Sequence, residues 1–122
     1  MVQYSTFYIL GRSLVFLETE VSLIIFIDAA CKNIVDVESK IDFLCMSQGC
    51  FPINVPQHTE EGLDLCLVIQ YYSRIRLVSI LLPLLRASPR GGRILSVLDG
   101  GREKPIITTD LGLDNPANYS WS

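Results

Sequence analysis

The segment Lys40-Ile-Asp-Phe-Leu-Cys-Met46 runs directly into the polar turn Ser47-Gln48-Gly49. A short apolar run that ends at a glycine-containing turn is typical of a buried β-strand. A second run, Arg93-Ile-Leu-Ser-Val-Leu98, has the same character. The residues between the two runs have helical periodicity, so the sequence predicts a strand–helix–strand unit with parallel strands.

The long helix of this unit is expected over residues 60–86. Thr59-Glu60-Glu61 offers a capping hydroxyl and two carboxylates, which favour the positive end of a helix dipole. Pro89 and Gly91-Gly92 are expected to end the helix. Its predicted apolar face recurs at steps of three and four and consists of Leu63, Leu67, Tyr71, Ile75, Val78, Leu82 and Leu85.

Two shorter apolar runs, Thr6-Phe-Tyr-Ile-Leu10 and Leu14–Leu17, precede this unit and are predicted as strands. Ser22 is expected to cap an amphipathic helix whose apolar face is Leu23, Ile27, Ala30, Cys31 and Ile34. Helices that alternate with apolar runs predict the α/β class, with parallel strands and helices on both faces of one sheet. Residues 1–122 are expected to form a single domain of this kind.

Ligands of such sheets bind beyond the carboxyl ends of the strands, so the strand tips are the candidate sites. The predicted tips are Gly11-Arg12-Ser13, Glu18-Thr19-Glu20, Ser47-Gln48-Gly49 and Asp99-Gly100-Gly101.

The composition excludes several classes of protein. In a chain of 122 residues, 49% hydrophobic and 19% charged residues exclude intrinsic disorder. A net charge of −3 argues against nucleic acid as a partner. The longest apolar stretches, Leu23–Ile27 and Leu77–Leu85, are shorter than the roughly 20 residues that a spanning helix needs, so no membrane span is predicted. No signal peptide is evident either, and a cytoplasmic location is expected.

The four cysteines are Cys31, Cys45, Cys50 and Cys66, and they show no C-x-x-C spacing. The single histidine, His58, lies in a predicted loop away from any cysteine pair, so no metal site is predicted. We interpret the cysteines as reduced thiols that pack as small hydrophobic residues.

From about Thr6 to Ser122 the chain resembles the short-chain dehydrogenase/reductase family, and most of all its divergent filamentous-fungal branch. The resemblance rests on the order and spacing of short motifs: Gly11-Arg12-Ser13, Glu20-Val21-Ser22-Leu23, residues 40–49, Glu61-Gly62-Leu63-Asp64, Tyr71-Tyr72-Ser73-Arg74, residues 81–86, residues 93–101 and Asn118-Tyr119-Ser120. It implies an incomplete Rossmann-like (doubly wound) sheet that lacks the family's first strand and glycine-rich loop. By this comparison the chain is expected to be truncated at both ends.

The resemblance implies a site for NADP, with binding that is weak or lost. Arg12 and Ser13 stand where the family meets the adenosine ribose, and an arginine there accepts a 2′-phosphate. Glu20 and Val21 stand at the adenine contact, and Ser47, Gln48 and Gly49 form the turn that approaches the cofactor. The alternatives are that Arg12 is a solvated turn residue and that Gly49 merely ends a strand.

The catalytic set of the family is not found in the sequence. The family needs a tyrosine with a lysine four residues later. The lysines of this chain are Lys32, Lys40 and Lys104, and the residues four positions before them are Asp28, Asp36 and Gly100, none of which is a tyrosine. Tyr119 and Asp99 are the weak candidates, because they align with the family's tyrosine and serine regions. No catalytic residue is therefore assigned.

Three functional hypotheses follow. The first is an NADP-dependent oxidoreductase of a ketone or alcohol, a small-molecule substrate, in fungal secondary metabolism. The second is a catalytically inactive reductase-like chain that binds at most a nucleotide or a protein. The third, a flavodoxin-like domain, would require a phosphate-binding loop after the first strand, and Arg12-Ser-Leu-Val is not one. Self-association through helix 60–86 is expected in either of the first two cases.

Overall fold

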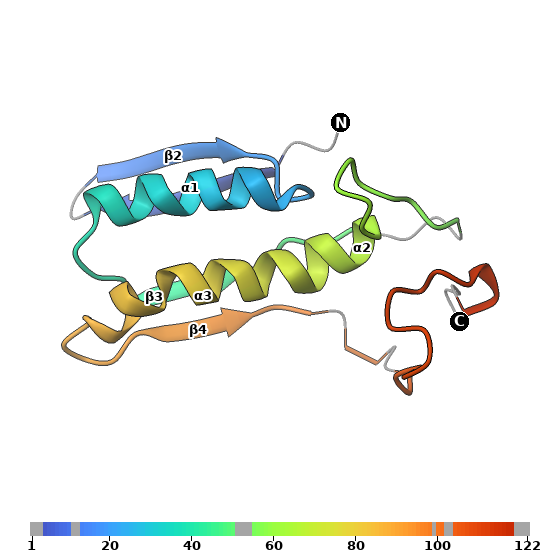
Figure 1. Cartoon of the computed structure of the whole chain (residues 1–122). Helices are drawn as coiled ribbons and strands as arrows, with labels where there is room; N and C mark the ends of the chain where they lie inside the picture. The colour runs from blue at the N-terminus through green and yellow to red at the C-terminus, as the bar shows by residue number, and fades with distance from the viewer. Residues whose placement is uncertain (1–3, 11–12, 51–54, 99, 102–103, 119–122) are drawn as a thin grey trace.

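The structure is a computed structural model that describes residues 4–10, 13–50, 55–98, 100, 101 and 104–118. Two strands, a helix and a third strand are followed by a long helical stretch and a fourth strand (Figure 1). The elements are β1 (Tyr4–Leu10), β2 (Ser13–Thr19), α1 (Ile24–Val37), β3 (Phe43–Met46), α2 (Leu65–Leu67), the π-helical turn η1 (Val68–Tyr72), α3 (Ser73–Arg86), β4 (Arg93–Ser96) and the 3₁₀ turn η2 (Pro116–Asn118).

Strands β3 and β4 form a parallel pair, with α2, η1 and α3 as the connection between them. Phe43 pairs with Arg93 at one end and Met46 with Ser96 at the other. The backbone N–H of Val97 donates to the carbonyl oxygen of Met46 at 2.9 Å, so the pairing continues past the end of β4. The predicted strand–helix–strand unit is confirmed, although each strand is shorter than expected. The chain is a mixed α/β structure with a small parallel sheet and flanking helices, consistent with an incomplete Rossmann-like fold.

Strands β1 and β2 differ from the prediction of one parallel sheet. They pair antiparallel, from Tyr4 with Thr19 to Leu10 with Ser13, and they form a two-stranded sheet separate from β3 and β4. The reason is the length of the connection. Parallel neighbours need a crossover of a dozen or more residues, whereas two residues link β1 to β2 and suffice for a hairpin.

The core lies between α1 and α3, which run side by side (Figure 1). Its buried side chains are Ile27, Cys31, Ile34 and Leu81, and Leu17 of β2 and Leu44 of β3 pack against them. On α1, the predicted apolar positions Ile27, Ala30, Cys31 and Ile34 are buried, which confirms the prediction there, whereas Leu23 precedes the helix and is half-buried. The outer face of the parallel pair is open, since Phe43 is 71% and Leu95 59% exposed.

Both helix starts differ from the prediction. Ser22 does not cap α1, because its hydroxyl donates to Glu20 Oε1 at 2.7 Å. Instead the Glu61 carboxylate accepts from the backbone N–H groups of Ile24 and Ile25, at 2.8 and 3.1 Å. The second helical stretch begins at Leu65 rather than near residue 60. Gly62 has a positive φ of 77°, which a helix cannot include, and Asp64 supplies the cap by accepting from Leu67 N–H at 2.9 Å.

The predicted apolar face of the long helix is wrong over its first half. Tyr71 and Ile75 are 56% and 51% exposed, while Val68 and Ile69 are fully buried. The π-helical turn η1 explains the difference, because it replaces i→i+4 hydrogen bonds with i→i+5 bonds and so rotates the faces of the helix around it. Farther along α3, Val78 and Leu82 are half-buried, and Leu85 is buried as expected.

Candidate functional site

The carboxyl ends of β3 and β4 lie next to each other and face the start of the long helical stretch (Figure 1). The turn Ser47-Gln48-Gly49 follows β3, and Val97 follows β4. This is the edge at which ligands of parallel α/β sheets bind. The sequence predicted that Ser47, Gln48 and Gly49 would lie here, and the structure places them at this edge.

Arg74 of α3 holds this edge together. Its guanidinium donates to the carbonyl oxygens of Gln48, Met46 and Val97, the last at 2.8 Å, and to the Ser96 hydroxyl. The residue is only 6% exposed, and burial lowers the pKa of its guanidinium. One charged side chain therefore satisfies carbonyl groups from both strand ends. Its Nε, by contrast, has no hydrogen-bond partner in the described part of the chain.

The turn is also bonded to η1 and α3 through polar side chains. Gln48 Nε2 donates to Ser73 Oγ at 3.2 Å, and Ser73 Oγ in turn donates to the carbonyl oxygen of Ile69 at 2.7 Å. Gln70 Nε2 donates to the carbonyl oxygen of Cys50 at 3.3 Å. The side chain of Gln48 is therefore engaged with the helix rather than directed outward.

The backbone on either side of Gln48 is accessible. Ser47 and Gly49 are both exposed, and among the described residues, its two chain neighbours aside, a Cβ placed on Gly49 would meet no atom within 4 Å. The space above Gly49 is thus open to a ligand. These two residues fit a cofactor that approaches the backbone of the turn, whereas the Gln48 side chain does not fit that role.

Glu20 and Val21 lie between β2 and α1 and have structural roles there. Glu20 Oε1 accepts from both the N–H and the hydroxyl of Ser22, and Val21 is only 5% exposed. Glu20 also borders an open cavity of about 830 Å³ between α1 and residues 57–60, to which His58 contributes. The lining of this cavity includes Glu20 but none of the residues Ser47, Gln48 and Gly49. The cavity therefore does not connect Glu20 with the turn after β3.

Three of the predicted residues, Arg12, Asp99 and Tyr119, lie outside the described residues. Ser13 is the first residue of β2, and the structure describes only its backbone. The NADP-type contact at Arg12 and Ser13 and the weak catalytic candidates therefore remain predictions.

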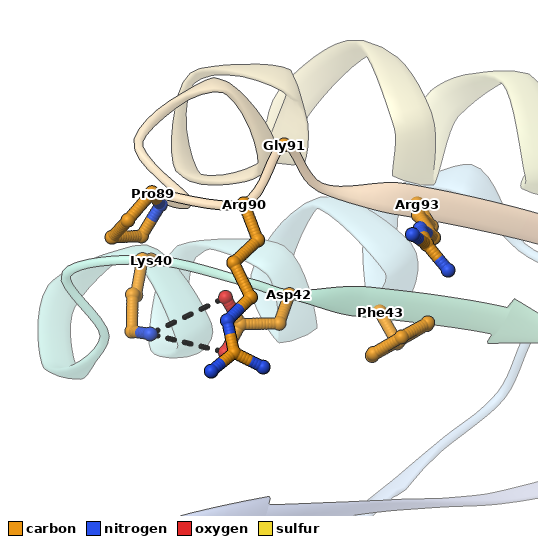
Figure 2. Close-up of a pocket in the computed structure, with 7 residues that line it drawn as sticks. All are labelled: Lys40, Asp42, Phe43, Pro89, Arg90, Gly91 and Arg93. Carbon is orange, nitrogen blue, oxygen red and sulfur yellow. Dashed lines mark hydrogen bonds and ion pairs between the residues drawn. The ribbon is translucent and has the colours of Figure 1, made fainter.

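A second cavity, of about 630 Å³, lies at the opposite end of the parallel pair (Figure 2). Lys40 Nζ lies 3.1 Å from Asp42 Oδ2, and the Ser88 hydroxyl donates to Asp42 Oδ1 at 2.6 Å. The hydrogen bond from Ser88, together with that from Lys40, lowers the pKa of Asp42. Arg90 and Arg93 add two more cations to the lining. The cavity is at the amino ends of the strands, away from the candidate cofactor edge.

Neither a metal site nor a clear membrane span is evident among the described residues. They contain no group of three or more histidine, cysteine, aspartate and glutamate side chains that could hold a metal ion. The stretch Leu65–Arg86 is long and apolar enough to cross a membrane by length and composition. One such helix is weak evidence for a span, because core helices of soluble proteins have the same length and composition; 28% of its apolar window is buried.

A parallel β3–α3–β4 unit with a glycine turn at its carboxyl edge is consistent with an incomplete Rossmann-like α/β protein. More particularly, the chain is homologous to fungal oxidoreductases, which include NmrA-like and short-chain dehydrogenase/reductase proteins. The resemblance predicted from the sequence is confirmed. Families of this kind bind a nicotinamide cofactor and act on small molecules.

Three relatives illustrate the match. The NmrA-like family domain-containing oxidoreductase notO of Aspergillus sp. (strain MF297-2) is 45% identical over 107 residues, which cover 87% of this chain and 32% of the relative. An oxidoreductase of Emericella nidulans is 43% identical over 105 residues, covering 86% of this chain and 31% of the relative. A short-chain dehydrogenase/reductase of Stachybotrys chartarum is 36% identical over 97 residues, which cover 72% of this chain and 27% of the relative.

The chain thus spans about a third of the length of the curated relatives it matches. No family model and no solved structure matches it.

Proposed function

We propose that these 122 residues form the adenosine-binding part of an NADP-dependent oxidoreductase of ketones or alcohols. The observation that carries the proposal is the position of the turn after β3, where Ser47 and Gly49 are exposed at the carboxyl edge of a parallel pair. The homology to fungal oxidoreductases supports it. We further propose a cytoplasmic location and a role in fungal secondary metabolism.

The residues that would hold the cofactor come from two places in the chain. The backbone of Ser47 and Gly49 would approach the adenosine, and the carboxylate of Glu20 would lie near the adenine. Arg12 and Ser13 would bind the 2′-phosphate, because a guanidinium forms paired, charge-assisted bonds with phosphate oxygens. When bound, the nicotinamide would supply the hydride.

Catalysis by these residues alone is not part of the proposal. The sequence contains no tyrosine followed four residues later by lysine, so no such pair is available to pass a proton to a carbonyl. An inactive chain that only binds nucleotide or protein is the second candidate, and the same observation favours it. We expect purified protein to show no NADPH or NADH consumption against a panel of ketones. Sustained turnover that survives repurification and disappears in Tyr119→Phe would contradict this expectation.

Binding is tested by calorimetric titration with 2′-phospho-adenosine compounds and their unphosphorylated counterparts. We expect weak binding that favours the 2′-phosphate and is reduced in Arg12→Glu. Gly49→Val is the matched variant at the turn, because the open space above Gly49 should let it fold while the added side chain blocks the approach of a ligand. Equal affinities for both ligands, or unchanged binding in both variants, would overturn the proposal.

We also propose that the chain associates with a second copy through the long helix, which the structure bounds at Leu65–Arg86. Tyr71, Tyr72 and Ile75 form an exposed apolar strip on it, and the outer face of β3 and β4 is apolar as well. Large exposed apolar patches favour association. Sedimentation across a concentration series tests this, and a monomer at every concentration would overturn it.

A further inference from the structure

Cys50 and Cys66 lie closer together than their separation in the sequence suggests. Cys50 directly follows the turn Ser47–Gly49, and Cys66 is in α2, yet their Sγ atoms are 2.9 Å apart. A disulfide bond is about 2.05 Å long, so a small adjustment of the two side chains would bring the sulfurs to bonding distance. Sequence spacing gave no sign of this pair, because 16 positions separate the two residues.

The surroundings hold the two sulfurs in this arrangement. Gln70 Nε2 donates to the carbonyl oxygen of Cys50, and Asp64 caps the turn of helix that carries Cys66. Both cysteines are partly exposed, so a small oxidant can reach them. The other two cysteines differ, since Cys31 is fully buried in the core and Cys45 is exposed on β3.

We propose that Cys50 and Cys66 are a redox modification site that closes to an intramolecular disulfide. The oxidant is a low-molecular-weight disulfide such as oxidised glutathione. One cysteine thiolate attacks a sulfur of the oxidant, forms a mixed disulfide and releases one reduced thiol. The second cysteine thiolate then attacks the protein sulfur of the mixed disulfide and releases the other reduced thiol. Two protein thiols are oxidised, one small disulfide is reduced, and the two protons pass to the released thiols.

Burial and the neighbouring Cys66 raise the pKa of the Cys50 thiol to about 12. Since thiolates rather than thiols react with disulfides, the Cys50 thiol reacts slowly at neutral pH and faster in alkaline solution. The disulfide is therefore expected to form slowly at neutral pH, so each glutathione buffer needs a long equilibration.

Closure would tie the turn after β3 covalently to the first turn of the helical stretch. Hydrogen bonds already join this region to later turns of the helical stretch, from Gln48 to Ser73 and from Gln70 to the carbonyl oxygen of Cys50. The oxidised chain would hold the backbone around Gly49 more tightly against the helix. This inference depends on the two sulfurs alone and stands whether or not the edge binds a nucleotide.

The test equilibrates the whole chain in buffers of increasing ratio of oxidised to reduced glutathione, followed by acid quenching and alkylation. The protein is digested with a glutamyl endopeptidase, because Glu60 and Glu61 separate the two cysteines, whereas trypsin has no site between Lys40 and Arg74. We expect a cross-linked pair of peptides that a reducing agent separates, and two fewer alkylated thiols than the four of the reduced chain. Full alkylation of all four cysteines in the most oxidising buffer would overturn the proposal.

Cys45 lies on the same peptide as Cys50, so Cys45→Ser is the matched control. We expect this variant to keep the cross-link and Cys50→Ser and Cys66→Ser to lose it. Loss of the cross-link in Cys45→Ser, or cross-links that only join two chains, would assign the oxidation elsewhere and overturn the proposal. If a variant at position 50 or 66 does not fold, the glutathione titration of the unmodified sequence and of Cys45→Ser still tests the proposal, because both chains should form the cross-link.

Discussion

The Arg74 guanidinium donates a hydrogen bond to the carbonyl oxygen of Val97 at 2.8 Å, so a helix side chain closes the end of strand β4. The same guanidinium reaches the carbonyl oxygen of Gln48 beyond β3. Replacing Arg74 by methionine should leave these partly buried carbonyl groups without the guanidinium donor. We expect the free energy of unfolding to fall by about 3 kcal/mol, as measured by urea denaturation.

Arg76 provides the control for this prediction, because it lies two residues along the same helix and is exposed. Arg76→Met should lower stability much less than Arg74→Met. Equal losses in the two variants would mean that Arg74 does not hold the strand ends together.

Gly92 is packed tightly at the start of β4, in contrast to Gly49. A Cβ at Gly92 would lie 2.5 Å from the carbonyl oxygen of Leu85 and 2.9 Å from that of Ile41, both backbone atoms that cannot turn aside. Gly92→Ala should therefore destabilise the chain by about 1–3 kcal/mol, whereas Gly49→Ala should change its stability little. Thermal unfolding of the two variants tests this, and similar melting temperatures would contradict it.

Glu61 caps α1 from a distant part of the chain, by accepting from the N–H groups of Ile24 and Ile25. Glu61→Ala should cost about 1 kcal/mol, as expected for a lost helix cap, and should increase fraying at the start of α1. Far-ultraviolet circular dichroism and urea denaturation measure both effects. Glu60→Ala is the matched control, and it should leave α1 unchanged.

Asp28 of α1 and Arg76 of α3 form a two-bonded ion pair, at 2.6 and 2.8 Å. The hydrogen bond from Arg76 lowers the pKa of Asp28 below its ordinary value of 3.8. The pair therefore stabilises the fold above that pH, and its contribution is lost as the pH falls through and below it. The effect should be small, because the side chains are 39% and 47% exposed.

We expect Asp28→Asn to be less stable than the unmodified chain at neutral pH, and the difference to vanish in strongly acidic solution. Urea midpoints at the two pH values measure this. A difference that does not depend on pH would show that the ion pair is not its cause.

Cys31 and Cys45 should react very differently with an alkylating reagent. Burial raises the pKa of the Cys31 thiol to about 11, and its side chain has no exposed surface, whereas Cys45 is exposed. Because the thiolate is the reactive form, Cys31 should stay unmodified at neutral pH while Cys45 is alkylated. Peptide mass mapping before and after unfolding checks this, and early alkylation of Cys31 would show that the core opens readily.

The sequence predicted the β3–α3–β4 unit correctly because the signals there are local. Apolar runs end at polar turns on either side of a long periodic segment, and the turn Ser47–Gly49 lies at the predicted edge. The hairpin was not predicted, since the parallel arrangement was inferred from the alternation of helices and strands. The two-residue link between β1 and β2 was the signal that could have corrected it.

The rest of the site depends on contacts between distant residues. Nothing near Arg74 in the sequence indicates that it is buried, because a cation in an apolar helix is usually solvated. No sequence pattern marks the π-helical turn at Val68–Tyr72. The regular helical spacing therefore placed Tyr71 and Ile75 on the buried face, whereas the structure exposes both. Likewise, the cap from Glu61 to α1 follows only from tertiary packing.

The two small sheets of this chain also impose an order on its folding. The β1–β2 hairpin is local and can form within about 1–10 μs, as soon as residue Thr19 is available. Met46 and Ser96, by contrast, can pair only after the whole helical crossover has been made. On the ribosome, the hairpin and α1 would emerge first. Ile27 and Ile34 could pack against Leu81 only after α3 had been synthesised. During that interval the nascent chain exposes the apolar face of α1, and a chaperone that binds apolar helices would compete with folding at that stage.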